Sequence, residues 1–367
     1  MFGLNAKISK WLLLLWSGLW ILSGRVIGQS RLGDYLGRSH DKRDTTYIRS
    51  FDQNITGRIY FTRKNTGFTI PDAKDASFDY KPNNASGLGL GFSYRYLTLN
   101  ASFNVFGKDA HKGKTKSLSL QTSLYKEQWV YDLVYQRYKG QYLSGSDDFS
   151  QGDHYYLRPD IRSTLLGGDF WRVMNSDRFS YRSVMTQNEQ QLKSAGSLLL
   201  GGELYLGGLR GDSALLPSLL MAAYPQQQTD KIRFFRIGVG AGYAYSYVFQ
   251  KHFFVSAGLT AIVDYAATSE FQQKQKKSVH VVAPNLSYRV SVGYNSRLFN
   301  INASVFNNSV PAHSALTNRK YNLFDQQFRV TIAKRFNIGH KLKTKLLKPV
   351  DEKMDQVEEK VKKLQGN

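Results

Sequence analysis

Charged side chains recur at alternate positions of segments whose remaining positions are apolar. Eight of them are candidates for the lining of a lumen: Arg58, Lys64, Arg95, Asp132, Glu203, Arg289, Arg329 and Arg335. Six are cations and two are anions, so the set favours a water-filled passage that prefers anions. The alternative is a structural ion-pair network around Asp132 and Glu203 that fills the lumen, because buried charges need partners.

Other residue types offer little chemistry. The chain has no Cys, which excludes a disulfide scaffold, a Cys-ligated metal and a Cys nucleophile. Its seven His show no ligand spacing, so neither a metal nor a cofactor is predicted. A lipid hydrolase would need a Ser beside a His, but His280 is separated from Ser287 and Ser291 by 7 and 11 residues of one strand. That separation is beyond hydrogen-bond reach.

The segments that would position these side chains alternate with period 2. Between 252 and 264, Val255, Leu259 and Val263 share one face, whereas Ser256 and Thr260 share the other. The alternating segments are 10 to 16 residues long, whereas strands of soluble proteins average about 5 or 6 and about 9 to 11 tilted residues cross a bilayer. Tight turns alternate with long polar loops, as in outer-membrane proteins. The sequence therefore predicts an all-β fold, a transmembrane antiparallel β-barrel.

The predicted barrel spans residues 55–336 and has about 14 strands, with 12 as the alternative count. Leu118, Leu120, Val255, Leu259, Val305 and Val330 are expected to face lipid. The candidate strands are 55–64, 85–95, 97–106, 115–125, 128–143, 161–174, 178–188, 195–207, 213–224, 233–249, 252–264, 280–294, 297–307 and 321–336. The segment 213–224 is the weakest because Pro217 interrupts it.

The two ends of the chain differ from the barrel. Lys7 and Lys10 precede a twelve-residue apolar run at 11–22, which predicts a signal peptide over 1–28 and a mature protein beginning at Gln29. Residues 29–54 are polar and aperiodic, which predicts a periplasmic lead-in. Residues 337–367 are basic and carry an apolar stripe at helical spacing, Val350, Met354, Val357, Val361 and Leu364. This tail is predicted to be a short amphipathic helix, either solvated or bound to a periplasmic partner, to another copy of the chain or to an anionic surface.

The net charge of +22 falls to +19 when Lys7, Lys10 and Arg25 leave with the signal peptide. An exported basic barrel meets the phosphates of outer-membrane lipid and lipopolysaccharide, and its cations are dispersed, so nucleic acid is not an expected partner.

Several segments resemble a known family. They include QRYKGQYL at 136–143 and QNEQQLKSAGSLLLGG at 187–202, and the similarity covers roughly 44–336. The chain is similar to the Bacteroidota family catalogued as domain of unknown function 4421. The resemblance implies an outer-membrane β-barrel of a Gram-negative bacterium, and it implies no substrate, reaction or catalytic residue.

Three functions remain open at this point. The first is a channel or porin-like passage with a basic lumen, and the second is a plugged structural or surface-binding barrel that recruits partners through its loops and tail. The third is an outer-membrane lipid hydrolase, so an enzyme is not the favoured expectation. Gly238, Gly240, Gly242 and Ala244 are predicted to face inward, and they leave room beside their strand that either holds a loop or the N-terminal segment or stays open.

Overall fold

The computed structural model describes residues 43–337 except 72–76, 84–85, 96, 107–108, 127, 145–154, 218–226, 273–274 and 318, together with Glu352 and Gln356. Residues 42–337 form one compact unit, and the rest of the chain is assigned to a second. The predicted signal peptide, the first part of the lead-in and nearly all of the basic tail lie outside the described residues.

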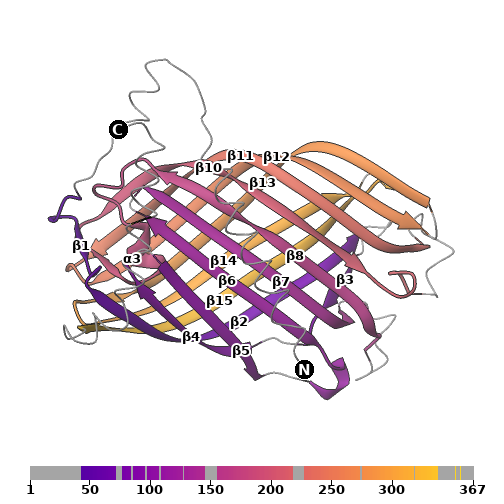
Figure 1. The fold of residues 1–367 in the computed structure, drawn as a ribbon, viewed down its shortest axis with the longest axis horizontal. Coiled ribbons are helices and arrows are strands. Elements are labelled where there is room, and N and C mark those ends of the chain that lie inside the picture. Colours follow the sequence, from indigo (N-terminus) through magenta and orange to yellow (C-terminus); the bar gives the residue numbers. More distant parts are fainter. Residues whose placement is uncertain are drawn as a thin grey trace, which may run out of the picture. The chain divides into compact units, whose positions relative to one another are not determined.

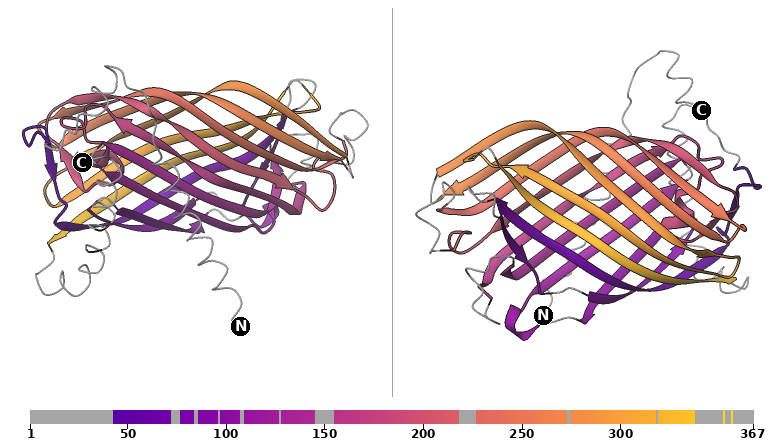
Figure 2. Two further views of the ribbon diagram at one scale, coloured as in Figure 1. Left: turned by 45° about the horizontal axis from the view of Figure 1, so that its top comes forward. Right: turned by 180° about the vertical axis from the view of Figure 1, so that it is seen from behind.

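A closed antiparallel ring of strands forms this unit (Figure 1). Its twelve described strands, in ring order, are β2 (Asn54–Pro71), β4 (Ser86–Tyr94), β5 (Leu97–Phe106), β6 (Lys116–Lys126), β7 (Trp129–Ser144), β8 (Leu157–Val173), β10 (Ala195–Arg210), β11 (Thr229–Phe249), β12 (Phe253–Gln272), β13 (Gln275–Asn295), β14 (Phe299–His313) and β15 (Lys320–Asn337). β15 pairs with β2 from Asn337↔Asn54 to Asn322↔Thr69, so the sheet closes into a barrel whose strands run obliquely (Figure 2).

The predicted fold class, a transmembrane antiparallel β-barrel, is confirmed, and the pairings of the described residues close it at the alternative count of twelve strands. Two candidate strands do not join the ring. The segment 178–188 contains the helix α3 (Tyr181–Met185). Residues 213–217 form no strand, because the consecutive apolar Leu215 and Leu216 turn into the barrel core; 218–224 lies outside the described residues.

One predicted loop is instead part of a long hairpin. Residues 265–272 extend β12 and residues 275–279 belong to β13, with partners from Phe253↔Tyr294 to Gln272↔Gln275. At the other end of β12 the chain turns tightly, with positive φ at Gln250 and Lys251. Positive φ at both central residues is the type I′ geometry that suits the twist of paired strands.

The wall is incomplete between β5 and β6. These strands pair only from Leu97↔Leu124 to Asn100↔Gln121, although β5 continues to Phe106 and β6 begins at Lys116. Beyond them the short strand β3 (Ser77–Lys81) pairs with both β2 and β7. The ring is therefore completed by β3 at the long-loop end and by β4, β5 and β6 at the short-turn end.

The two faces of the wall differ as the alternation predicts. Val239 and Val282 are each 70% exposed on the outside, and Leu118, Leu120, Val255, Leu259 and Val305 are also exposed there. An outward apolar band around a polar interior is the pattern of a barrel surrounded by lipid. Among the described residues, no helix is long and apolar enough to cross a membrane.

Side chains fill the interior at both ends. Near the long loops, an apolar core joins Phe68, Tyr80, Ile161, Leu215 and Tyr321 from separate strands and from the segment after β10. The Tyr80 hydroxyl donates to the Leu215 carbonyl at 2.6 Å. Near the short turns, a second cluster contains Trp171, Phe179, Leu199, Ala244 and Ile262.

Candidate functional site: a plug in the barrel

Two segments distant in sequence meet at the short-turn end, and together we call them the plug: residues 43–53 and 174–194. Strand β1 (Ile48–Ser50) pairs with β9 (Glu189–Gln191) in the register Ile48↔Gln191, Arg49↔Gln190 and Ser50↔Glu189. The first segment lies in the predicted periplasmic lead-in. The second connects β8 to β10 and takes the place of the predicted strand 178–188, together with the tight turn expected before it.

The helix of the plug begins at a capping serine. Ser180 is the N-cap of α3, and its hydroxyl accepts a hydrogen bond from the Ser183 amide at 2.9 Å. Such a bond satisfies one of the amides that a helix start leaves without a partner. The helix ends before Gln187, whose φ is +56°, and this turn sends the chain into β9.

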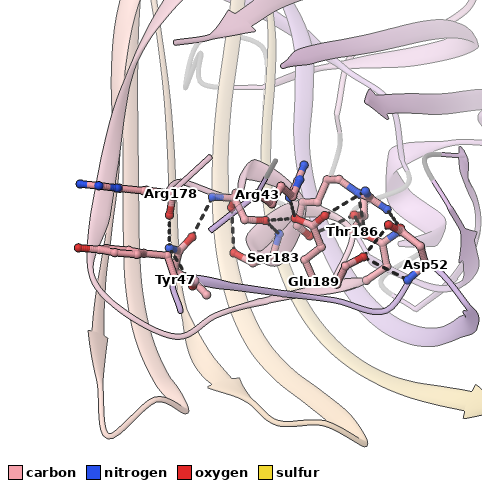
Figure 3. Close-up of polar contacts among 12 residues, drawn as sticks. Arg43, Tyr47, Asp52, Arg178, Ser183, Thr186 and Glu189 are labelled. Atoms are coloured by element: carbon pink, nitrogen blue, oxygen red, sulfur yellow. Dashed lines mark hydrogen bonds and ion pairs between the residues drawn. The ribbon is translucent and has the colours of Figure 1, made fainter. Parts of the chain in front are cut away.

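Glu189 is the centre of the plug's charges (Figure 3). Its side chain is fully buried and forms ion pairs with Arg43 and, at 3.0 Å, with Arg182. The Ser180 hydroxyl also donates to this carboxylate. Arg182 in turn forms an ion pair with Asp52. One buried carboxylate thus ties the helix to both halves of the plug, which is the arrangement that a buried charge requires.

Two arginines of the barrel wall hold the plug in place. Arg58 of β2 donates to the Thr186 carbonyl at 2.6 Å. Arg335 of β15 donates to the Gln187 carbonyl and, at 2.8 Å, to the Asn295 side chain. Because β2 and β15 are paired neighbours, the two guanidinium groups donate hydrogen bonds to consecutive carbonyls of the plug from adjacent strands.

The plug also reaches the short turns elsewhere in the ring. The Gln190 side chain donates to the carbonyls of Lys251 and Asn295, each at 2.9 Å. The Asn188 side chain donates to the Arg95 carbonyl in the turn after β4. These bonds connect the plug to the β4–β5, β11–β12 and β13–β14 turns, so it extends across the end of the barrel.

The acidic groups at the edge of the plug make its stability depend on pH. Burial alone would raise the pKa of Asp52, but the Arg182 charge and the hydrogen bonds from Ser50 and Arg182 lower it overall. Hydrogen bonds from Thr46 likewise lower the pKa of Asp44. A carboxyl group whose folded pKa is depressed stabilises the fold above its unfolded pKa of about 3.9, and that stabilisation disappears as the pH falls through the folded value.

We therefore expect Asp52→Asn to weaken the plug at pH 7 and to weaken it less at pH 3, because the stabilisation by the Asp52 carboxylate diminishes once the pH falls below the unfolded pKa of about 3.9. Trp171 lies in the cluster that contacts the plug, so tryptophan fluorescence during urea unfolding at pH 7 and at pH 3 provides the measurement. Ser213→Asn, at the opposite end, is the control. An equal difference between wild type and Asp52→Asn at both pH values would contradict this prediction.

Above the plug, the charges of the lumen form two groups. Arg289 forms ion pairs with Asp132 at 2.8 Å and with Asp169 at 3.2 Å, and the Tyr125 hydroxyl donates to Asp132 at 2.7 Å. In the second group, Arg236 forms an ion pair with Asp264 and lies 3.9 Å from Glu203. The Asn285 side chain donates to Glu203 at 3.0 Å.

The remaining predicted lumen residues are dispersed. Lys64 donates to Ser119 at 3.4 Å, and the Arg329 guanidinium lies 4.5 Å from the centre of the Tyr60 ring. Arg95 lies in the turn after β4 with φ of +50°. The structure thus brings Asp132 together with Arg289, and Arg58 together with Arg335 through the plug, but it does not unite all eight residues.

Several participants were not singled out from the sequence: Asp169, Arg182, Glu189, Arg236 and Asp264. Arg236 has the same strand parity as the inward Gly238, so the alternation could have identified it. Arg182 carried no such signal, because it belongs to the segment 178–188, which was expected to be a strand, and Glu189 directly follows that segment.

The plug lies beside one of the small inward residues of β11. Ala244 belongs to the same buried cluster as Phe179, against which Tyr47, Tyr181 and Met185 pack. The room beside Gly238, Gly240, Gly242 and Ala244 was predicted either to hold a loop or the N-terminal segment or to stay open. Residues of both plug segments lie in the cluster that contains Ala244.

The hydrolase candidates do not meet. His280 lies on the exposed outer face and its Nδ1 is 2.7 Å from the Tyr265 hydroxyl, whereas Ser291 is buried on the inner face and contacts Ser304. Within the described part of the chain, no group of three or more His, Asp or Glu side chains could hold a metal ion.

A pocket on the outer side of the plug carries positive charge. Arg49, Lys251, His252 and Arg297 are among its lining residues, and its empty volume is about 760 Å³. Its position beside the short turns marks a surface at which the plug can be reached from outside the barrel.

Fold and site together define a class, a transmembrane β-barrel with an internal plug at its short-turn end. The chain belongs to the family described as Domain of unknown function (DUF4421), whose model matches residues 42–336. This confirms the family resemblance, and the match takes in both segments of the plug.

Other comparisons add little. No curated protein matches the chain. Among solved structures, the outer membrane protease OmpT of Escherichia coli is 9% identical with a TM-score of 0.32, covering 78% of this chain and 98% of its own. The attachment invasion locus protein Ail of Yersinia pestis is 12% identical with a TM-score of 0.20, covering 77% and 98%. The toluene transporter TodX of Pseudomonas putida is 9% identical with a TM-score of 0.21, covering 78% and 91%. Scores this low carry no argument about this chain.

Proposed function

We propose that the protein is an outer-membrane barrel with a sealed lumen, which acts as a structural or surface-binding barrel. The observation that carries this proposal is the fully buried Glu189, which joins Arg43 and Arg182 inside the barrel end. Buried ion pairs hold the plug together, and Arg58 and Arg335 of the wall form hydrogen bonds with it. Displacing the plug would cost much free energy, because each separated charge would be left without a partner.

The contents of the lumen support the same proposal. An anion-preferring pore needs cations that are hydrated and accessible, whereas Arg289 and Arg236 are each neutralised by two nearby carboxylates. The apolar core at the long-loop end, which includes the inward Leu215 and Leu216, is a second obstruction of the lumen, in addition to the plug. Ion flow would have to pass both the plug and this core.

The second candidate is the porin-like passage with a basic lumen. Arg58, Lys64 and Arg329 supply cations on the inner face without a carboxylate in ion-pair contact among the described residues. Under this candidate the plug moves on binding a partner. The third candidate, a lipid hydrolase, is the least supported, because His280 and Ser291 are on opposite faces.

The cellular placement belongs to the proposal as well. A cleaved signal peptide over residues 1–28 would export the chain, and the short turns would face the periplasm as in other outer-membrane barrels. The lead-in 29–54, whose last residues enter the plug, and the basic tail 337–367 would then be periplasmic. Lipopolysaccharide and outer-membrane lipid would surround the wall, and the tail would bind a periplasmic partner.

Single-channel recording in planar bilayers tests the sealed lumen. The purified, refolded wild type is expected to be silent while circular dichroism and heat-modifiable mobility show a folded barrel. The double variant Glu189→Gln, Arg335→Gln removes one anion and one cation that hold the plug and should increase current noise or brief openings. Asp212→Asn with Lys334→Gln removes one exposed anion and one exposed cation outside the plug and serves as the charge-matched control. Discrete, anion-selective openings of the wild type would overturn the sealed barrel and establish the passage.

A further inference from the structure

Cations line up across the outer wall at the long-loop end. The strand register places Lys116 opposite Lys139, Lys139 opposite Arg162, Arg162 opposite Arg210, and Arg210 opposite Lys231. Two further cations, Arg137 and Arg233, lie two residues nearer the short turns on β7 and β11. We call these seven residues the basic row. It crosses the neighbouring strands β6, β7, β8, β10 and β11 (Figure 1).

These side chains point outward. On β8 the inward residues Ile161 and Ser163 are buried on either side of Arg162, and directly opposed residues of paired strands share a face. On β6, Lys116 has the same parity as Leu118 and Leu120, which are exposed on the outer face. The row is therefore on the wall that meets the surroundings, and the lumen charges lie on the other side.

The basic row lacks the counter-charges that the lumen has. Among the residues that the structure describes, none of its seven cations forms an ion pair with an acidic side chain, and the Arg162 Nε is buried with no hydrogen-bond partner. Lys231 and Arg233 contact the ring of Phe271, at 4.5 and 5.7 Å from its centre. Like charges directly opposite one another on paired strands are destabilising, so an external anion would stabilise this surface.

The neighbouring residues on the same face indicate which kind of anion the basic row would bind. Two pairs nearer the short turns, the register aligns Leu120, Tyr135, Leu166, Leu206 and Phe235 on the same five strands. A free phosphate would gain nothing from this apolar strip, whereas a lipid can place its headgroup on the cations and its acyl chains on the strip. Arginine is well suited to phosphate because its planar fork donates two parallel hydrogen bonds.

We propose that the basic row binds the phosphate groups of a phosphorylated lipid in the leaflet next to the long loops. The inference rests on the proposed membrane location and is independent of whether the lumen is sealed. Clusters of Lys and Arg beside a membrane-spanning surface recognise anionic headgroups by the same physics.

Native mass spectrometry of the refolded full-length protein in detergent micelles tests the site. The probes are lipid A carrying two phosphates and the same lipid with both phosphates removed. The wild type should retain the phosphorylated lipid at least 10-fold more tightly. The row variant Lys139→Gln, Arg162→Gln, Arg210→Gln should bind it about 100-fold more weakly than the wild type, at about a factor of five for each cation removed.

A matched variant separates site from total charge. Arg63→Gln, Lys251→Gln, Lys334→Gln removes three exposed cations outside the row and should bind the lipid as the wild type does, and heat-modifiable mobility should show that both variants fold. Equal affinity for the two lipids, or equal loss in the two variants, would overturn the proposal. Displacement of the lipid by an equal phosphate concentration of inorganic phosphate would assign the row to free anions instead. Lipid binding is measured independently of conductance, so these outcomes can be interpreted even if the wild type proves to conduct ions.

Discussion

Replacing Arg236 with Met should destabilise the barrel by about 3–5 kcal/mol, because removal of one member of a buried ion pair leaves the others uncompensated. Arg236 is 1% exposed, and the Asp264 and Glu203 that face it are equally buried. The measurement is the free energy of unfolding from urea titrations in micelles.

The accompanying variants make this result specific. Arg233→Met removes an exposed arginine from the same strand and should change stability by no more than about 0.5 kcal/mol. The triple variant Arg236→Met, Asp264→Asn, Glu203→Gln should recover part of the loss, because no charge then remains buried without a partner. A loss below about 1 kcal/mol in Arg236→Met would show that these carboxylates do not depend on the guanidinium group.

Replacing Leu259 with Arg should cost about 2–4 kcal/mol, the penalty for a lipid-facing cation near the bilayer midplane. Leu259 lies at the middle of the outward apolar stretch of β12, from Phe253 to Tyr265, and its side chain is 55% exposed. It is paired with Tyr243 and Tyr288, which are also exposed, so the new charge has no partner there. Heat-modifiable mobility and urea unfolding in lipid vesicles give the readout.

Depth provides the control for this substitution. Ser278→Arg places the same side chain on the outer face of β13 close to the long-loop end, where a cation should cost only about 0–1 kcal/mol. Val305→Arg on β14 repeats the midplane test on another strand. Equal effects of Leu259→Arg and Ser278→Arg would argue that lipid does not surround this part of the wall.

The wall could be predicted because its information is local. Period-2 alternation along one strand separates Leu259 from Thr260 and identifies Glu203 and Arg289 as inward without reference to any partner strand. The number of strands in the ring could not be predicted from local alternation, because it depends on whether segments such as 178–188 pair with neighbouring strands. Phe179 and Tyr181 alternate there with Ser180 and Arg182. This alternation resembles that of a strand, but it is too short to distinguish a strand from a helix.

The plug and the basic row could not be predicted, for different reasons. The plug depends on the pairing of Ile48 with Gln191, and nothing local links those segments; only the Ser180 to Ser183 spacing of a helix cap hinted at α3. The basic row depends on strand register, because Lys139 and Arg162 become neighbours only when β7 and β8 are aligned.

The position of the plug also has a consequence for assembly. Arg58 and Arg335 stand on β2 and β15, the two strands whose pairing closes the ring, and they hold the adjacent carbonyls of Thr186 and Gln187. The first and last strands are the most distant in sequence and therefore the slowest to find each other. The plug segment 174–194, which comes from the middle of the chain, offers both strands a shared docking surface, so we expect enclosure of this segment and joining of the chain ends to be one folding step.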